Sequence, residues 1–175
     1  MRIVSALALW LLLASTSAHA WECKDWGEWF NDRCIGTKEA WKEGDWNLIV
    51  PFYTWHAPWS YPNRDYENAY PLGGGIGRSV DKGRNTDMLY AMAFQDSHWK
   101  PMYVAGYSYL YNWGEQKSFH SGIGFTAFIW ARSDNNYIPY PGLAPIGSVG
   151  FSRFSVMGTY LPGIDVAMFW AQFKF

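Results

Sequence analysis

Apolar and polar positions alternate strictly along the last ten residues of the chain. One face of residues 166–175 is wholly apolar and the opposite face is mixed with polar tips: Phe169, Ala171, Phe173 and Phe175 against Met168, Trp170, Gln172 and Lys174. A lipid-facing strand of a transmembrane β-barrel requires this arrangement of faces. The pattern therefore favours an outer-membrane barrel over a soluble protein.

Segments of the same kind recur along the chain, each bounded by clusters of Gly, Asn, Asp or Pro. They predict eight strands, at residues 46–59, 70–81, 86–97, 101–113, 118–132, 138–151, 153–162 and 164–175. We expect an all-β fold, an eight-stranded antiparallel transmembrane β-barrel over residues 46–175. A small periplasmic β-sandwich with an aromatic core is the alternative interpretation.

Residues 1–20 have the features of a signal peptide. Arg2 precedes an apolar run through Leu13, and the segment ends on Ala18-His19-Ala20, so cleavage is expected after Ala20. The apolar run is too short for a spanning helix. No later stretch has about 18 apolar residues, which excludes an inner-membrane helical protein.

Residues 21–45 do not alternate, and at about 100° per residue they form an amphipathic α-helix. Its two faces are Trp26, Trp29, Phe30, Cys34, Thr37 and Trp41 against Lys24, Glu28, Asp32, Lys38, Glu39 and Lys42. Such a helix lies in the membrane interface or docks against the periplasmic end of the barrel. Gly27 and Gly36 each weaken it by roughly 1 kcal/mol relative to Ala, so we expect it to depend on membrane or barrel contact.

The two cysteines, Cys23 and Cys34, belong to a chain bound for an oxidising compartment, which favours a disulfide. A continuous helix opposes it, because eleven residues at about 1.5 Å per residue separate the cysteines by roughly 16 Å. A bridge requires the helix to start after Cys23 or to break near Gly27, and both possibilities stay open. Two cysteines and four scattered histidines are too few for a zinc site, so we expect no metal.

Composition fits a barrel and excludes a nucleic-acid-binding protein. Aromatic residues make up 20% of the chain, with 12 Trp, while the mean hydropathy is slightly polar at −0.21. Alternation reconciles the two values, because half of each strand faces lipid and half faces the lumen. The formal net charge is −1, whereas a nucleic-acid-binding domain is usually strongly basic.

Glycines cluster on two predicted strands, and those of the fifth strand lie on its inner face. They are Gly73, Gly74, Gly75 and Gly77 on the second strand and Gly122 and Gly124 on the fifth. They leave interior space in a barrel that is normally filled by its own side chains, or they accommodate tight barrel curvature. The sequence does not separate these two interpretations.

Strand direction brings chemistry to one rim of the barrel. Counted from a periplasmic N-terminus, the first and third strands run outward and end near His56 and near Asp96-Ser97. Imidazole, carboxylate and hydroxyl form a minimal set for acyl transfer, with the His as general base and the hydroxyl as nucleophile or oxyanion donor. We take His56, Asp96 and Ser97 as candidate catalytic residues; the alternative is chance proximity in a small chain.

These residues belong to a longer set of sequence words. They are TWHA (residues 54–57), GGGIG (73–77), LYAMAFQDS (89–97), AGY (105–107), GFTA (124–127), NYIP (136–139), SVG (148–150) and TYLPG (159–163). In this order they resemble the PagP family, the lipid A palmitoyltransferases, over nearly the whole mature chain.

The resemblance implies an outer-membrane enzyme that moves a palmitoyl chain from a phospholipid donor to lipid A, with His56, Asp96 and Ser97 as its His, Asp and Ser. Whether Ser97 is acylated or only polarises a carbonyl stays open, as does whether Asp96 orients His56 or organises the rim. The acyl chain would enter laterally where prolines interrupt strand pairing, at Pro51, Pro139, Pro141 or Pro145. Ester exchange needs only positioning and proton transfer, so we expect no cofactor, and we expect a monomer.

One position departs from the family pattern. Related members have a glycine twelve residues after the Asp, at the floor of the acyl pocket, and Ser108 stands there in this chain. We expect a preference for an acyl chain shorter than palmitate, unless the neighbouring Gly106 and a local register shift restore the depth.

Basic residues near the rim suggest contacts to the phosphates of lipid A. Arg132 ends the fifth strand and is the principal candidate for a bidentate phosphate contact; Arg78 and Lys100 are weaker ones. The alternative is a surface Arg132 that pairs with Asp134.

A different class of function fits the export signal, the alternation and the terminal Phe equally well. It is a non-enzymatic small outer-membrane barrel for lipid binding or adhesion. It does not explain the His56 and Asp96-Ser97 words or the glycine-rich interior.

Overall fold

The computed structural model describes residues 22–24, 27–63, 67–115 and 117–175. The predicted signal peptide, residues 1–20, lies outside the described residues. The chain forms two compact units, residues 1–35 and residues 36–175, and the second contains the whole barrel.

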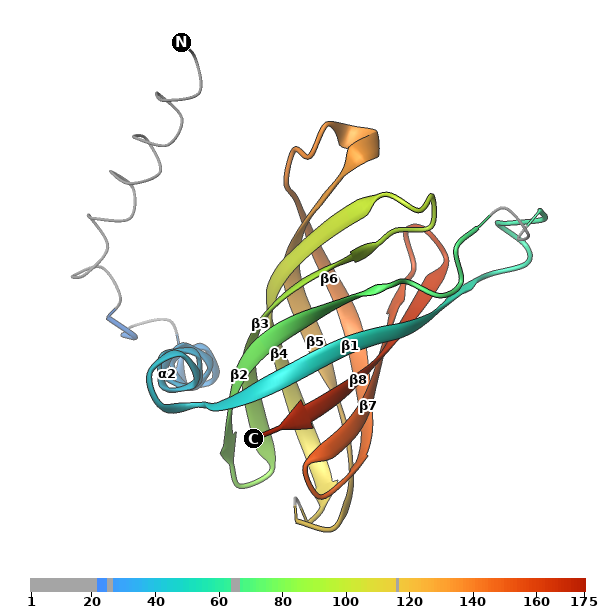
Figure 1. Cartoon of the computed structure of the whole chain (residues 1–175). Coiled ribbons are helices and arrows are strands. Elements are labelled where there is room, and N and C mark those ends of the chain that lie inside the picture. Colours follow the sequence, from blue (N-terminus) through green and yellow to red (C-terminus); the bar gives the residue numbers. More distant parts are fainter. Residues whose placement is uncertain (1–21, 25–26, 64–66, 116) are drawn as a thin grey trace. The chain divides into compact units, whose positions relative to one another are not determined.

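The barrel has eight antiparallel strands (Figure 1): β1 Asp45–His56, β2 Gly73–Lys82, β3 Asn85–Gln95, β4 Pro101–Gly114, β5 Phe119–Arg132, β6 Tyr140–Phe151, β7 Phe154–Leu161 and β8 Val166–Lys174. Each strand pairs with its neighbour in the sequence, and β8 pairs with β1 to close the barrel. The predicted fold class is thus confirmed. The predicted strand ends lie within three residues of the observed ones, and the largest differences flank the long β1–β2 connection.

Two seams of the barrel are only partly paired. The β1–β2 ladder stops at the pair of Ile49 with Gly75, although β1 continues to His56. The β6–β7 ladder stops at the pair of Ile146 with Thr159. Prolines lie beside both ends, Pro51 on β1 and Pro145 on β6. Proline has no N–H group to donate to a strand ladder, so the interruptions at these positions are expected.

The two faces of the strands differ in chemistry. Outward positions carry exposed large apolar side chains, among them Trp46, Leu48, Val50, Phe52, Ile76, Tyr103, Ile123, Ile129, Leu143, Val149 and Phe173. Inward positions form one buried cluster that fills the middle of the lumen: Ile49, Met88, Tyr90, Met92, Phe94, Met102, Val104, Leu110, Ile146, Met157 and Trp170. A barrel of eight strands is narrow enough for its own side chains to fill the interior, and this cluster does so.

The lumen becomes polar toward the end where β1 begins. A cavity of about 420 Å³ there is lined by Ser79, Ser108, Asn112, His120, Ser148 and Gln172, together with other residues. Asn47 Nδ2 donates to Ser79 Oγ and Gln172 Nε2 donates to Asn47 Oδ1, at 2.9 and 2.8 Å. The apolar core therefore separates two polar ends of the barrel.

The inward glycines of β5 permit close packing. A Cβ on Gly124 would collide with the backbone carbonyl of Tyr109, and one on Gly122 would collide with the side chains of Asn112 and Ser148. At these positions the structure favours the second interpretation of the glycines, the accommodation of a tightly packed barrel.

The predicted helix is present as α2, Glu28–Glu43, which is shorter than the predicted range 21–45 because residues 22–24 and 27 are not helical and β1 begins at Asp45. Within the second unit its buried positions are the small residues Gly36 and Ala40, while Trp41 is 64% exposed. A Cβ on Gly36 would collide with the Asp87 carboxylate, so Gly36 allows close approach to β3. Of the helices in the described ranges, none has both the length and the apolar character to cross a membrane.

Arg78 is bound to the end of this helix, away from the rim that carries His56. Its guanidinium donates to the carbonyl oxygens of Gly44 and Trp41 and lies 5.1 Å from the centre of the Trp46 ring. Arg78 thus caps the helix C-terminus, and its location contradicts the prediction of a phosphate contact at the rim.

Cys23 and Cys34 form a disulfide within the first unit. The bridge is possible because α2 starts only at Glu28, after Gly27 with a φ of +89°. Gly readily accepts a left-handed φ, and the helix does not extend past this residue toward the N-terminus. The condition set by the sequence, a helix that begins after Cys23, is met.

Candidate active site

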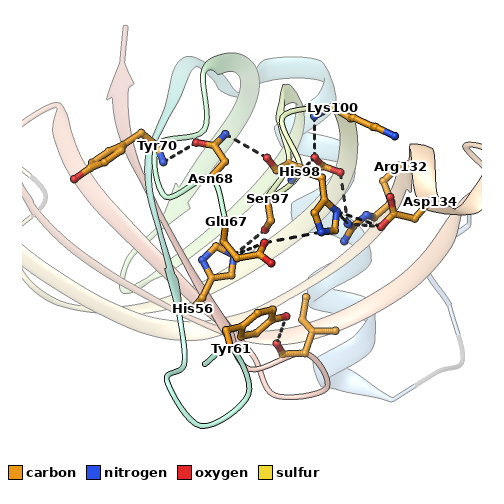
Figure 2. A network of polar contacts seen from close by, with 12 residues as sticks. His56, Tyr61, Glu67, Asn68, Tyr70, Ser97, His98, Lys100, Arg132 and Asp134 are labelled. Atoms are coloured by element: carbon orange, nitrogen blue, oxygen red, sulfur yellow. Dashed lines mark hydrogen bonds and ion pairs between the residues drawn. The ribbon is translucent and has the colours of Figure 1, made fainter. Parts of the chain in front are cut away.

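His56 and Ser97 meet at one rim of the barrel, as strand direction predicts (Figure 2). His56 is the last residue of β1, and Ser97 lies in the turn between β3 and β4. Nε2 of His56 is 2.7 Å from Oγ of Ser97, a distance at which the hydroxyl donates to a neutral imidazole. His56 is only 4% exposed, and its ring meets that of Tyr61 edge to face.

Asp96 organises the turn that carries Ser97. Its Oδ1 accepts the N–H groups of His98 and Lys100 at 2.8 and 2.9 Å, and the backbone N–H of Asp96 donates to the carbonyl of Lys100. Trp99 in this turn has a left-handed φ of 63°, which is costly for a bulky side chain unless neighbouring contacts fix it. Of the two roles open to Asp96, the structure favours rim organisation.

The connection between β1 and β2 covers the site with Glu67 and Asn68. The N–H of Asn68 donates to the carbonyl of Ser97 at 2.8 Å, and its Nδ2 donates to the carbonyl of Asp96 at 3.2 Å. Oε2 of Glu67 lies 3.9 Å from Nε2 of His56 and 4.0 Å from Nε2 of His98. A carboxylate thus lies near both imidazoles.

Arg132 projects from the end of β5 into the same cluster (Figure 2). Its Nη2 contacts Oδ2 of Asp134 at 2.5 Å, Nδ1 of His98 at 3.1 Å and Oδ2 of Asp96 at 3.5 Å. The ligand-type atoms of Asp96, His98 and Asp134 lie within 4.8 Å of one another. A metal ion there would have to displace the guanidinium, because Arg132 already contacts all three.

A second loop closes the site from the side of β7 and β8. Tyr61 Oη donates to the carbonyl of Ile164 at 2.9 Å. Asp165 accepts the hydroxyls of Ser60 and Tyr160, and these hydrogen bonds hold the pKa of the Asp165 carboxyl below its ordinary value. Burial, followed by the charge of Glu67, raises the pKa of Tyr61, so that Tyr61 remains a donor.

Below the polar rim a cavity of about 110 Å³ leads toward the lumen. Its lining is polar at the mouth and apolar beneath, and includes Glu67, Ser97, Phe94, Met102, Trp130 and Met168. Tyr90, whose hydroxyl contacts Thr126 Oγ1 at 2.6 Å, belongs to the buried apolar cluster further along the lumen. A polar head group and an apolar tail fit such a mouth and interior.

Gly106 and Ser108 lie at this deeper level. A Cβ on Gly106 would meet Phe128 Cβ and Tyr90 Oη, both at 2.8 Å, so neighbouring side chains already fill the space that Gly106 leaves. Ser108 is 1% exposed and borders the polar cavity of the far end. The β3–β4 ladder runs through both residues without a register shift.

The sequence therefore predicts the meeting of His56 and Ser97 but not the groups around them. Glu67 lies in a segment interpreted only as a long polar loop, and periodicity does not place a loop residue. His98 directly follows Asp96-Ser97 in the sequence. The predicted position of that pair at the rim could therefore have indicated that His98 lies there too. Asp134 beside Arg132 agrees with the surface pairing considered for Arg132.

The chain is similar in sequence to proteins of one known family. Residues 36–171 match the family described as "Antimicrobial peptide resistance and lipid A acylation protein PagP". The lipid A acyltransferase PagP of Citrobacter rodentium (strain ICC168) is 37% identical over 97% of this chain and 93% of its own. The lipid A palmitoyltransferase PagP of Escherichia coli (strain K12) is 38% identical over 85% of each chain, and the lipid A acyltransferase PagP of Salmonella typhi is 38% identical over 99% of this chain and 94% of its own. The match of the family over most of the barrel and these identities show that the chain belongs to the PagP family.

Proposed function

We propose that this protein is a lipid A acyltransferase of the outer membrane, which moves an acyl chain from a phospholipid to lipid A. The observation that carries the proposal is the contact of His56 Nε2 with Ser97 Oγ at 2.7 Å, at the mouth of a cavity that leads into an apolar lumen. The apolar outer face of the barrel supports the location. Family membership supports the activity over the non-enzymatic barrel.

The reaction is an ester exchange. A hydroxyl oxygen of lipid A forms the new bond to the acyl carbon, the bond from that carbon to the glycerol oxygen breaks, and the hydroxyl proton ends on the glycerol oxygen. His56 carries this proton between the two oxygens, and the products are acylated lipid A and a lysophospholipid. In a two-step route Ser97 is first acylated and lipid A then attacks the acyl-serine. Trapped acyl-Ser97, seen by intact-protein mass spectrometry, separates this route from direct transfer.

The substrates reach the lumen between strands. Strand pairing is missing in the upper parts of the β1–β2 and β6–β7 seams, beside Pro51 and Pro145. An acyl chain can therefore pass there without breaking a continuous ladder of hydrogen bonds. An apolar groove of about 580 Å³ lies over the β6–β7 seam. Lateral access through these seams spares the polar head group from crossing the apolar core.

The acyl pocket favours a chain shorter than palmitate. Ser108 stands at the deep end of the lumen, and Tyr90 and Phe128 occupy the space at Gly106, so that neither Gly106 nor a register shift adds depth. In competition between donors, fourteen-carbon chains should be transferred in preference to sixteen-carbon chains, and Ser108→Gly should move the preference toward the longer chain. A wild-type protein that clearly prefers sixteen carbons contradicts this part of the proposal.

Arg132 binds a phosphate of lipid A in this account. The guanidinium exchanges the Asp134 carboxylate for the phosphate, two of whose oxygens can accept N–H groups of one guanidinium. Arg132→Lys should raise KM for lipid A more than KM for the phospholipid, because an ammonium cannot form the paired contact.

The test is acyl transfer by the purified barrel in detergent, with a defined phospholipid and lipid A. The wild type should form acylated lipid A and lysophospholipid in equal amounts. His56→Ala should lose turnover while it keeps the β-sheet circular dichroism spectrum of the wild type. Equal turnover, or equal absence of turnover, in the two folded proteins contradicts the proposed function.

A further inference from the structure

The predicted catalytic set leaves the charge of His56 without a partner. When His56 accepts a proton it becomes an imidazolium, and a buried cation is costly unless a carboxylate lies nearby. Asp96 does not fill this role in the structure: Oδ1 accepts two backbone N–H groups, and Oδ2 lies 3.5 Å from Arg132 Nη2. In the described ranges, no hydrogen bond or ion pair joins the Asp96 and His56 side chains.

Glu67 is the carboxylate that lies close to His56. Its Oε2 is 3.9 Å from Nε2, the same nitrogen that contacts Ser97. The Glu67 side chain is 16% exposed, and Oε2 is buried and accepts no hydrogen bond from the part of the chain that the structure describes. A buried carboxylate oxygen without a donor is unfavourable at rest, and positive charge on His56 would relieve that cost.

Backbone contacts hold Glu67 at this place. The next residue, Asn68, is 1% exposed and binds the carbonyl oxygens of both Ser97 and Asp96. Its Oδ1 accepts the N–H of Tyr70 at 3.0 Å (Figure 2). The loop segment with Glu67 is therefore attached to the Ser97 turn.

His98 lies on the other side of Glu67 in a defined tautomer. Arg132 Nη2 donates to His98 Nδ1 at 3.1 Å, and because an arginine N–H only donates, Nδ1 carries the lone pair. Neutral His98 therefore has its proton on Nε2, the nitrogen 4.0 Å from Oε2 of Glu67. A protonated nitrogen lies at that side of the carboxylate, with Nε2 of His56 at the other.

We propose that Glu67 is the positioning carboxylate of this site, which stabilises the imidazolium of His56 while a hydroxyl proton passes to the leaving oxygen. This inference rests on the proposed acyl transfer. The acid of a Ser-His-Asp arrangement binds the ring nitrogen opposite the nucleophile, whereas Glu67 lies beside Nε2 itself and acts on the imidazolium through its charge. Titratable and charged groups surround His56 on every neighbouring element: Tyr61, Glu67, Asp96, His98, Arg132, Asp134 and Asp165. Arg132 offsets Asp96 and Asp134, so the negative charge of Glu67 acts on His56 most directly.

The experiment compares Glu67→Gln, Glu67→Asp and the control Glu115→Gln, which changes an exposed carboxylate at the far end of the barrel. Each purified protein is assayed in detergent for kcat and for KM of both lipids, between pH 5 and 9. Loss of one charge about 4 Å from the imidazolium should lower kcat of Glu67→Gln by about 10- to 100-fold. KM should stay at the wild-type value, and the acid limb of the kcat profile should move to lower pH. Glu67→Asp should recover part of kcat, and Glu115→Gln should match the wild type.

Two results overturn the inference while the proposed function stands. One is a Glu67→Gln enzyme with wild-type kcat and an unmoved acid limb. The other is a raised KM at unchanged kcat, which assigns Glu67 to lipid binding. If the Gln variant does not fold, Glu67→Asp decides the matter, because wild-type kcat with a displaced carboxylate contradicts the proposed role. A folded wild type without turnover refutes the proposed function itself, and the inference with it.

Discussion

Substitution of Asp96 separates its two possible roles, because Ala and Asn remove different contacts. Asp96→Ala removes both hydrogen bonds from the N–H groups of His98 and Lys100. Bonds to a charged acceptor contribute about 1.5–3 kcal/mol each, so the turn loses about 3–6 kcal/mol. Asp96→Asn keeps an oxygen acceptor for the same N–H groups at about 1 kcal/mol each, and so retains roughly a third of that energy or more.

The activity should follow the turn. The left-handed Trp99 in this turn already costs about 1–3 kcal/mol, so without the Asp96 contacts the turn should leave its conformation and carry Ser97 away from His56. We expect kcat/KM to fall about 100-fold or more in Asp96→Ala and about tenfold in Asp96→Asn. The assay is acyl transfer in detergent, with Glu115→Gln as a control far from the site. Equal losses in the Ala and Asn variants would refute the reasoning, because a carboxylate that acts by its charge on His56 is lost in both.

Three further predictions follow from the packing and the loops. Gly106→Ala should lower the free energy of unfolding in urea by about 1–3 kcal/mol without lengthening the preferred acyl chain, since its Cβ meets Tyr90 and Phe128; unchanged stability contradicts the packing. Alkylation of the unreduced protein should label neither Cys23 nor Cys34 and alkylation after reduction should label both, and loss of the bridge should remove about 3 kcal/mol in the chain-entropy account; labelling before reduction refutes the bridge. The lowered pKa of Asp165 means that its hydrogen bonds stabilise the folded loops above the ordinary value of 3.8 and are lost as the pH falls through the folded value. Pepsin should therefore cleave residues 57–63 faster as the pH falls through this range, and Asp165→Asn should abolish that dependence.

Local pattern was sufficient to predict the barrel. A strand buried on one side and facing lipid on the other must alternate, so periodicity finds the strands and turn residues bound them. Antiparallel order then fixes direction, which is why the meeting of His56 with Ser97 could be predicted before any coordinates.

Features that depend on packing between distant segments could not be predicted in this way. The disulfide depends on where α2 begins, and the left-handed Gly27 sets that point. The space beside Gly106 is filled by Tyr90 from the adjacent strand, a contact that counting along one strand does not reveal. Glu67 reaches His56 through a loop whose path is fixed by Asn68, and no periodic signal marks such a path.

The most direct test of the central claim is mass spectrometry of lipid A from cells that lack their own lipid A acyltransferase and express this chain either intact or as His56→Ala. The account predicts lipid A heavier by one acyl chain with the intact protein and unmodified lipid A with the variant, both proteins being folded in the outer membrane. Unmodified lipid A from cells with the intact, membrane-inserted protein would contradict the account and favour the non-enzymatic barrel.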